Sequence, residues 1–409
     1  MREMKDSGVA WIGEIPENWN IRKLSGIAPI ITDYVASGSF AALSKNVNYL
    51  DEPDYAMLVR TADLSGSSNN SVYINEQAYN FLSNSNLYGG EVILSNIGSV
   101  GNVFYFIPTY PKNSLAPNAI MINGCENNKF IYYWFCNPTA NDELKRIGSH
   151  AVQLKFNKTQ LRKFWVAYPP VKEQAGIVDI LDKKSSQVDA IISNNEAQIE
   201  KLKQYKQSLI TEVVTKGLDP TVPMKGSGVE WIGEIPAHWE VIQAKRLSQI
   251  GHGTDPKTEG DIPVYGSGAT SFKTCGEYKE GPTVLIGRKG ATLHIPHYIE
   301  GRYWNVDTAF DVQTNVELMI LKYYYYLAQC FDYKYYVSQT TLPSMTQMSY
   351  QNMVLPLPYL AEQESIVAEL DTKCTQIDSL ISIKQAKIEK LIQYKKSLIY
   401  EYVTGKKEV

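Results

Sequence analysis

The residues that could do chemistry are few, and they form no familiar catalytic pattern. The close pair His294 and His297 has no carboxylate partner nearby in the sequence, so we expect no metal there. The Gly-His-Gly-Thr segment at 251–254 is too short a fragment to indicate a nucleotide loop, and no P-loop or H-E-x-x-H motif occurs. The Tyr-Pro-Pro-Val segment at 168–171 lacks the amide and the aromatic residue of an amino-methyltransferase loop. A magnesium-binding pattern for strand cleavage is also missing. We therefore predict no catalytic residue and no metal in this chain.

The cysteines and the apolar pattern indicate a protein of the cytoplasm. Five scattered cysteines without C-x-x-C spacing are expected to be buried free thiols: Cys125, Cys136, Cys275, Cys330 and Cys374. No apolar run approaches ~20 residues, and the first residues show no apolar signal core, so we expect neither a membrane span nor secretion.

Net charge and tyrosine content leave the kind of partner open. The formal charge of −3 is not the basic excess typical of a nucleic-acid binder, so any such role needs local positive charge or charge from a partner. The 28 tyrosines suit either a β-rich core or an interface, where their rings give rigid contact area.

Repeats show which elements must position the functional residues. The segment 7–16 returns almost unchanged at 227–236, and Trp19 returns as Trp239. A second repeat, from Pro169, returns from Pro358 without a gap. A duplicated unit of this kind predicts a pseudo-symmetric molecule. The repeats divide the chain into segments 1–19, 20–168, 169–216, 217–239, 240–357 and 358–409.

Each copy of the second repeat predicts a long amphipathic helix. Apolar residues recur at three, four or seven positions, proline precedes each copy, and Gly217 or Gly405 follows it. A helix of this length would reach ~65 Å and cannot bury its apolar stripe alone. We predict that the copies form an antiparallel coiled coil. Its predicted seam consists of Ile177, Leu181, Val188, Ile192, Ile199, Leu202, Leu209, Ile366, Leu370, Ile377, Ile381, Ile388, Leu391 and Leu398. The alternative is that each helix packs only on its own domain.

The segments between the repeats, which we call the first insert (20–168) and the second insert (240–357), have another pattern. Short apolar runs broken by Gly, Asn, Ser and Pro predict strands and turns, with short helices at 128–135 and 317–328. The two inserts share a skeleton, because Val92 to Ser99 aligns with Val284 to Ala291. We predict an α+β protein with two pseudo-symmetric domains joined by two long antiparallel helices.

In these features the chain resembles the DNA-specificity subunit of Type I restriction–modification systems. The motifs are the repeated Trp-Ile-Gly-Glu-Ile-Pro phrase, the Pro-x-x-x-Glu-Gln segments at 169–174 and 358–363, and the long helices. The Leu-Ile-Gly-Arg-Lys-Gly turn at 285–290 adds to them. The ordered repeat of all of these covers nearly the whole chain.

The resemblance implies a non-catalytic subunit that recognises double-stranded DNA. Each insert would be a target-recognition domain for one half of a bipartite, asymmetric site, and the helix pair would set the spacer. Its partners would be two methyltransferase subunits, which use S-adenosylmethionine to methylate adenine, and two restriction subunits, which use ATP and magnesium. No cofactor is expected in this chain.

Base recognition requires polar or basic side chains on loops that enter a groove, with glycine allowing close approach. In the second insert this favours Arg288, Lys289, Thr340, Thr341, Ser344 and Gln347. In the first insert it favours Asn96, Ser99, His150, Gln153, Lys155 and Asn157, with Arg60 as a phosphate contact. Each of these could instead be an ordinary loop residue.

Two other functions fit parts of the sequence. One is an orphan specificity subunit that serves a methyltransferase without restriction. The other is a coiled-coil scaffold with two ligand-binding heads, possible for carbohydrate given the aromatic content, although the repeated phrase has no role there.

Overall fold

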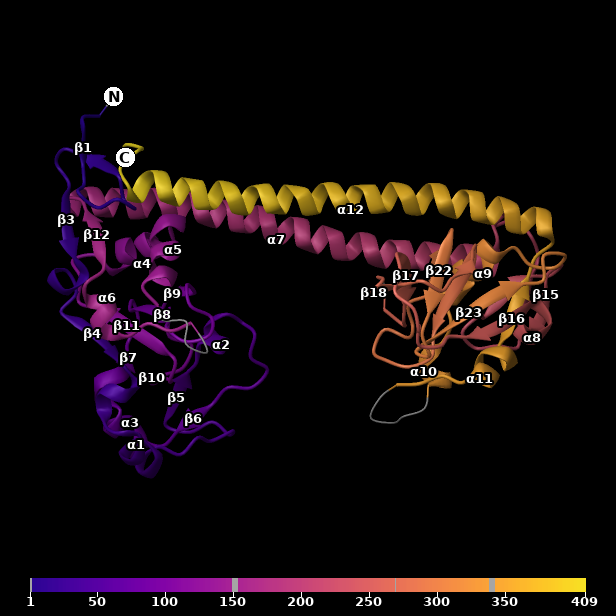
Figure 1. Cartoon of the computed structure of the whole chain (residues 1–409), viewed down its shortest axis with the longest axis horizontal. Coiled ribbons are helices and arrows are strands. Elements are labelled where there is room, and N and C mark those ends of the chain that lie inside the picture. The colour runs from indigo at the N-terminus through magenta and orange to yellow at the C-terminus, as the bar shows by residue number, and fades with distance from the viewer. Residues whose placement is uncertain (1, 149–153, 269, 338–342) are drawn as a thin grey trace. The chain divides into compact units, whose positions relative to one another are not determined.

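The computed structural model describes residues 2–148, 154–268, 270–337 and 343–409 (Figure 1). Contacts divide the chain into two compact units, one of Met1–Asn194 with Lys387–Val409 and the other of Asn195–Ala386. Each unit thus holds one insert and a part of each long helix. This division passes through the long helices, whereas the sequence repeats suggest separate helical segments.

The first insert contains two four-stranded sheets within its described residues. The sheet of order β4-β11-β8-β9 consists of Ile30–Asp33, Ala119–Asn123, Val92–Ser95 and Val103–Tyr105. The sheet of order β6-β5-β10-β7 consists of Tyr73–Ile74, Ala56–Val59, Asn113–Leu115 and Asn86–Leu87. Only β5 and β10 run parallel among these strand pairs. The helices are α1 to α6: Phe40–Asn46, Thr61–Leu64, Glu76–Phe81, Asn128–Cys136, Pro138–Arg146 and Lys158–Arg162.

The second insert has the same topology. Its sheet of order β16-β23-β20-β21 consists of Ser248–His252, Ala309–Thr314, Thr283–Gly287 and His297–Ile299. The sheet of order β18-β17-β22-β19 consists of Lys273–Cys275, Ile262–Tyr265, Arg302–Asn305 and Lys279–Glu280, with β17 and β22 parallel. Its helices are α8 to α11: Ala244–Leu247, Leu321–Ala328, Tyr333–Tyr336 and Gln347–Asn352. The alignment of the two inserts is therefore confirmed strand by strand.

A short antiparallel pair closes each insert at its base. In the first insert β3 (Asn20–Lys23) pairs with β12 (Trp165–Tyr168), and in the second β15 (Glu240–Gln243) pairs with β24 (Val354–Leu357). The first and last strands of an insert therefore lie side by side, directly before a long helix. An insert built in this way is a closed module.

The long helices are α7 (Val171–Lys216) and α12 (Leu360–Val403) (Figure 1). In the second unit, Gln198 bonds to Lys384, and Lys206 donates to Asp378 at 2.8 and 2.7 Å. From the first of these pairs to the second, the residue number rises along α7 and falls along α12, so the helices are antiparallel. In the first unit Lys395 donates to both oxygens of Asp189 at 2.7 Å.

The residues of the predicted seam are all buried or half-buried, but they pack in two different environments. Ile177, Leu181, Ile366 and Leu370 belong to the cores of the inserts, so the ends of the helices pack on their own domains. Val188, Ile199, Ile377 and Ile388 are buried outside those cores, in the helix pair itself. Both packing modes predicted from the sequence therefore occur, at different points of the same stripe.

The repeated phrase folds as a hairpin that packs on a helix end. Its hairpins are β1 with β2 (Met4–Asp6, Glu14–Pro16) and β13 with β14 (Met224–Gly226, Glu234–Pro236). Trp19 and Trp239 are fully buried, and they lie 3.2 Å from a Cβ built on Gly405 and Gly217 respectively. These glycines have φ of 72° and 74°, a conformation that glycine adopts easily after a helix. The phrase is thus repeated because each long helix ends against one copy.

The predicted start of one short helix was wrong. The helix expected at 317–328 begins only at Leu321, because Asn315 holds the preceding residues in a turn by accepting bonds from Met319 and Glu317. Ile191 and Leu380 share the apolar periodicity of the long helices but lie outside the predicted seam, and they are 41% and 47% exposed. No helix within the described residues is both long and apolar enough to cross a bilayer.

Candidate nucleic-acid interface

The candidate residues of the second insert come from two distant segments that the fold joins. The turn 288–290 directly follows β20, and Met345 donates its backbone N–H to Arg288 O at 2.9 Å. Gly290 donates to Pro343 O at 3.0 Å, and Lys289 forms a β-bridge with Ser344. Backbone bonds therefore join this turn to the segment that follows residue 342.

The Arg288 side chain is held on one edge. Its Nη1 donates to Asp307 O at 3.1 Å and lies 3.6 Å from Asp307 Oδ2, and the guanidinium carbon lies 5.9 Å from the centre of the Phe310 ring. The side chain remains 33% exposed. A guanidinium anchored in this way keeps donors for a second acceptor, which is the geometry needed to bind a guanine edge. Lys289 is 42% exposed, with Nζ 3.9 Å from the same carboxylate.

A histidine that the sequence did not single out for this site completes the cluster. His252 Nε2 lies 2.9 Å from Gln347 Oε1, and the imidazole meets the Phe310 ring edge-on at 5.0 Å. Gln347 Nε2 donates to Ile250 O at 3.1 Å, so its amide joins α11 to β16. In the sequence, His252 belongs only to the weak Gly-His-Gly-Thr fragment. The structure shows that it ends β16 and contacts the same Phe310 ring as Arg288, which the sequence alone could not reveal.

The first insert repeats the same backbone frame. Phe156 donates to Asn96 O at 3.1 Å, Gly98 donates to Leu154 O at 3.4 Å, and Ile97 forms a β-bridge with Lys155. Each bond has its counterpart in the second insert. The frame is therefore shared, while the side chains on it differ.

Several predicted residues of the first insert have partners within the protein. Asn96 is half-buried and donates Nδ2 to Phe156 O at 3.1 Å, so its amide holds the turn. Asn157 caps α6 by accepting from Gln160 N at 3.0 Å. Arg60 donates to both oxygens of Asp63 at 3.0 and 2.7 Å and to Ser68 at 2.6 Å, and its side chain is 34% exposed. Its role as a phosphate contact stays a prediction.

Ser99 and Lys155 remain exposed beside the 96–99 turn. Four predicted residues lie outside the described residues: His150, Gln153, Thr340 and Thr341. The structure therefore brings together Arg288, Lys289, Ser344 and Gln347 in one insert, and Ser99 and Lys155 in the other.

Three cysteines and His297 are held in their neutral forms. Burial raises the pKa of Cys125 and Cys136 to about 12 and that of Cys330 to about 11, so these thiols stay protonated near neutral pH. Burial also lowers the pKa of His297, which favours its neutral form. Among the residues that the structure describes, no group of three or more potential ligands could hold a metal ion.

Comparison with known proteins gives a consistent result. The family model described as the Type I restriction modification DNA specificity domain matches residues 16–204 and 236–393. A protein of Methanocaldococcus jannaschii, provisionally named the MjaX type I restriction enzyme specificity subunit, is 24% identical over 428 residues, which cover 97% of this chain and 95% of that protein. The MjaVIII specificity subunit of the same organism is 26% identical over 272 residues, covering 59% of this chain and 61% of that one.

A solved structure, described as the structural basis underlying complex assembly and conformational transition of the type I R-M system, has the same fold. Its TM-score is 0.70 at 16% identity, and the match covers 96% of this chain and 99% of that one. Since the family model matches well over half of the chain and reaches both inserts, the chain belongs to the Type I restriction–modification DNA-specificity family, whose members determine the DNA sequence specificity of these systems.

Proposed function

We propose that each insert recognises one half of a bipartite DNA site and that the long helices set the number of base pairs between the halves. The observation that carries this proposal is the duplicated turn. The same backbone bonds support both turns, yet Arg288 and Lys289 stand in one insert where Asn96 and Ile97 stand in the other. Two unlike surfaces on one frame fit an asymmetric target.

Within this proposal the chain performs no chemistry. Two methyltransferase subunits, which bind S-adenosylmethionine, dock on the pseudo-symmetric frame, and two restriction subunits that use ATP and magnesium join them. A duplicated frame suits identical partners, because each copy offers the same surface. The structural relative belongs to work on complex assembly of the type I R-M system, which supports this view. Partner subunits also supply part of the phosphate contact that a chain of net charge −3 lacks.

Exchange of one insert tests the division of labour. Residues 20–168 are replaced by the corresponding insert of another family member, and the hybrid is produced with its methyltransferase partner in cells that lack adenine methylation. The closing strands β3 and β12 define the junctions. Sequencing of methylated adenines should show one changed half-site, with the other half and the spacer retained. A change in both halves would disprove the proposal.

A length change in the helices tests the spacer. One turn is added to α7 near Gln198–Lys203 and one to the facing part of α12. A turn adds ~5.4 Å, and a base pair occupies ~3.4 Å of the duplex. We expect the preferred spacer to grow by one or two base pairs while both half-sites keep their bases. An unchanged spacer would show that the helices do not measure it.

A further inference from the structure

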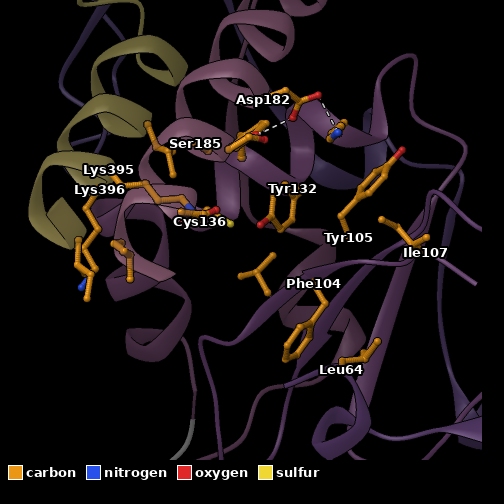
Figure 2. Close-up of a pocket in the computed structure, with 18 residues that line it drawn as sticks. Leu64, Phe104, Tyr105, Ile107, Tyr132, Cys136, Asp182, Ser185, Lys395 and Lys396 are labelled. Atoms are coloured by element: carbon orange, nitrogen blue, oxygen red, sulfur yellow. Dashed lines mark hydrogen bonds and ion pairs between the residues drawn. The ribbon is translucent and has the colours of Figure 1, made fainter. Parts of the chain in front are cut away.

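The first insert is attached to its long helix by a polar joint, which we define as Tyr105, Lys129, Tyr133 and Asp182. Asp182 on α7 accepts a hydrogen bond from Lys129 Nζ at 2.7 Å and another from Tyr133 OH at 2.7 Å (Figure 2). Both donors belong to α4. Lys129 Nζ also lies 5.2 Å from the centre of the Tyr105 ring on β9. One carboxylate thus joins the helix to the insert.

The second insert carries the same joint, made of Tyr298, Lys322, Tyr326 and Asp371. Asp371 on α12 accepts from Lys322 Nζ at 2.7 Å and from Tyr326 OH at 2.6 Å, both on α9. Lys322 Nζ lies 5.5 Å from the centre of the Tyr298 ring on β21. In both copies the lysine side chain is 34% exposed and the aspartate 36%.

The neighbouring rings match as well. Tyr105 and Tyr132 have ring centres 6.0 Å apart at 60°, and Tyr298 and Tyr325 have centres 5.9 Å apart at 57°. The inserts differ elsewhere, in length and at the 96–99 and 288–290 turns. Retention of this geometry in two diverged copies indicates that the joint serves something both inserts need.

Stability does not explain the joint well. Exposed or partly exposed ion pairs add little to the free energy of folding. The buried apolar residues of α4 and α7, among them Phe130, Ile131 and Ile177, already hold these helices together. Apolar burial is non-directional, however, so it does not by itself fix an angle. Two charge-assisted or polar hydrogen bonds to one carboxylate fix both distance and direction.

A cavity beside the joint of the first insert leaves room for the angle between insert and helix to change. A hollow of about 620 Å³ lies next to Asp182 between β9, α4 and the helix pair, lined among others by Leu64, Ile107 and Ile192 (Figure 2). No side chain fills it. The insert can therefore tilt toward the helices on this side unless the polar joint resists.

We propose that Asp182 and Asp371 are positioning residues that fix the angle of each insert on its long helix and thereby restrict the DNA spacer to one length. The inference deepens the proposed function and rests on it. One base pair more or less moves a half-site by ~3.4 Å and rotates it by roughly 34°. A rigid joint rejects such a site, and a loose one follows the rotation.

The test uses the full chain with its methyltransferase partner, and sequencing of methylated adenines reports half-sites and spacers together. The variant is Asp182→Ala with Asp371→Ala. Its control is Asp179→Ala with Glu364→Ala, which removes exposed carboxylates from the same two helices. We expect methylation at spacers one base pair longer or shorter to rise at least about tenfold relative to the preferred spacer, or about 1.4 kcal/mol. The bases of both half-sites should stay the same, and the control should behave as wild type.

An unchanged spacer distribution in the folded double variant would overturn the inference, as would altered half-site bases. If the alanine variant does not fold, Tyr133→Phe with Tyr326→Phe removes one hydrogen bond from each joint and is judged by the same two outcomes. A wild-type protein that directs methylation to an undivided site would instead disprove the proposed function. The two failures are therefore distinguishable.

Discussion

The two inserts differ most where they are expected to meet DNA and least where they meet the long helices. At the turns, Asn96 is bonded inward to Phe156 O, whereas Arg288 is anchored on one edge and stays one-third exposed. At the joints, Asp182 and Asp371 each accept from a lysine at 2.7 Å and from a tyrosine at 2.7 and 2.6 Å respectively. The same backbone bonds support both turns, although the side chains on them differ. The joints depend on side chains and have not changed.

The second sheets of the inserts show another difference. In the first insert, buried residues including Leu43, Leu58 and Leu82 form a core between this sheet and α1 and α3. In the second insert the comparable core is small and contains Val264, Cys275 and Val306. The extra length of the first insert therefore covers a sheet that the second insert stabilises by other contacts.

If the frame is truly duplicated, matched deletions in it should have equal and large effects. Leu181 and Leu370 are both fully buried in the cores that join a long helix to an insert. Leu181→Ala and Leu370→Ala should each lower the free energy of unfolding by about 2–5 kcal/mol. Denaturant unfolding of the full chain measures both.

The matched controls are Ile191→Ala and Leu380→Ala, at exposed positions on the same helices, and we expect them to change stability by less than ~0.5 kcal/mol. A strong effect of Leu181→Ala with a weak effect of Leu370→Ala would show that the two frames are not equivalent.

The inserts also differ in the last residue of a central strand, which is Gly287 in β20 and Ser95 in β8. A Cβ on Gly287 would lie 2.2 Å from Leu293 Cα, so the main chain must move to admit it. The corresponding residue of the first insert is Ser95, which is buried and already has a side chain. Gly287→Ala should cost about 1–3 kcal/mol through overpacking, while Ser95→Ala should cost less. Thermal unfolding tests this order, and equal losses would contradict it.

The sequence predicted the frame better than the interface, for physical reasons. Helical periodicity is a local signal, and α7 and α12 begin and end within a few residues of the expected bounds. Alignment of the repeats also paired Val92 with Val284 correctly. The direction of a side chain is harder to predict. Asn96, Asn157 and Arg60 have the chemistry of DNA contacts, but the Asn96 amide binds Phe156 O, a partner 60 residues away that only the folded chain brings near. Asn157 and Arg60 bind partners three residues away, so the local capping pattern was a signal in the sequence.

The polar joints were also visible in the sequence in part. Lys129 and Tyr133 are four residues apart, as are Lys322 and Tyr326, so each pair lies on one face of a short helix. The aspartate that completes each joint lies on a separate long helix. Periodicity places Asp182 and Asp371 outside the apolar stripe of their helices. Only the tertiary structure brings each aspartate next to the lysine and the tyrosine of its insert.

Loss of a single side chain from each turn should separate the roles of the turns. Arg288→Ala should weaken specific binding by about 1–3 kcal/mol and relax base preference at one position. Asn96→Ala should lower stability by about 0.5–1.5 kcal/mol through the lost bond to Phe156 O, without a change in base preference. Binding at fixed salt to site variants, together with thermal unfolding, distinguishes these outcomes. If Asn96→Ala instead altered base preference, the inward-facing amide would have a recognition role as well.

The smallest expected effect concerns a hydrogen-bonded carboxylate beside the sheet of order β18-β17-β22-β19 in the second insert. Glu277 accepts hydrogen bonds from Thr258 Oγ1 at 2.7 Å and Lys257 N at 2.7 Å, and these bonds lower its pKa from 4.5 to about 2. Because the folded pKa is depressed, the stabilisation is present above pH 4.5 and is lost as the pH falls toward 2. Glu277→Gln should remove this part of the acid sensitivity, so its melting temperature should fall less steeply than that of wild type between pH 5 and 2. Parallel curves for the two proteins would show that the Glu277 carboxylate does not stabilise this part of the second insert.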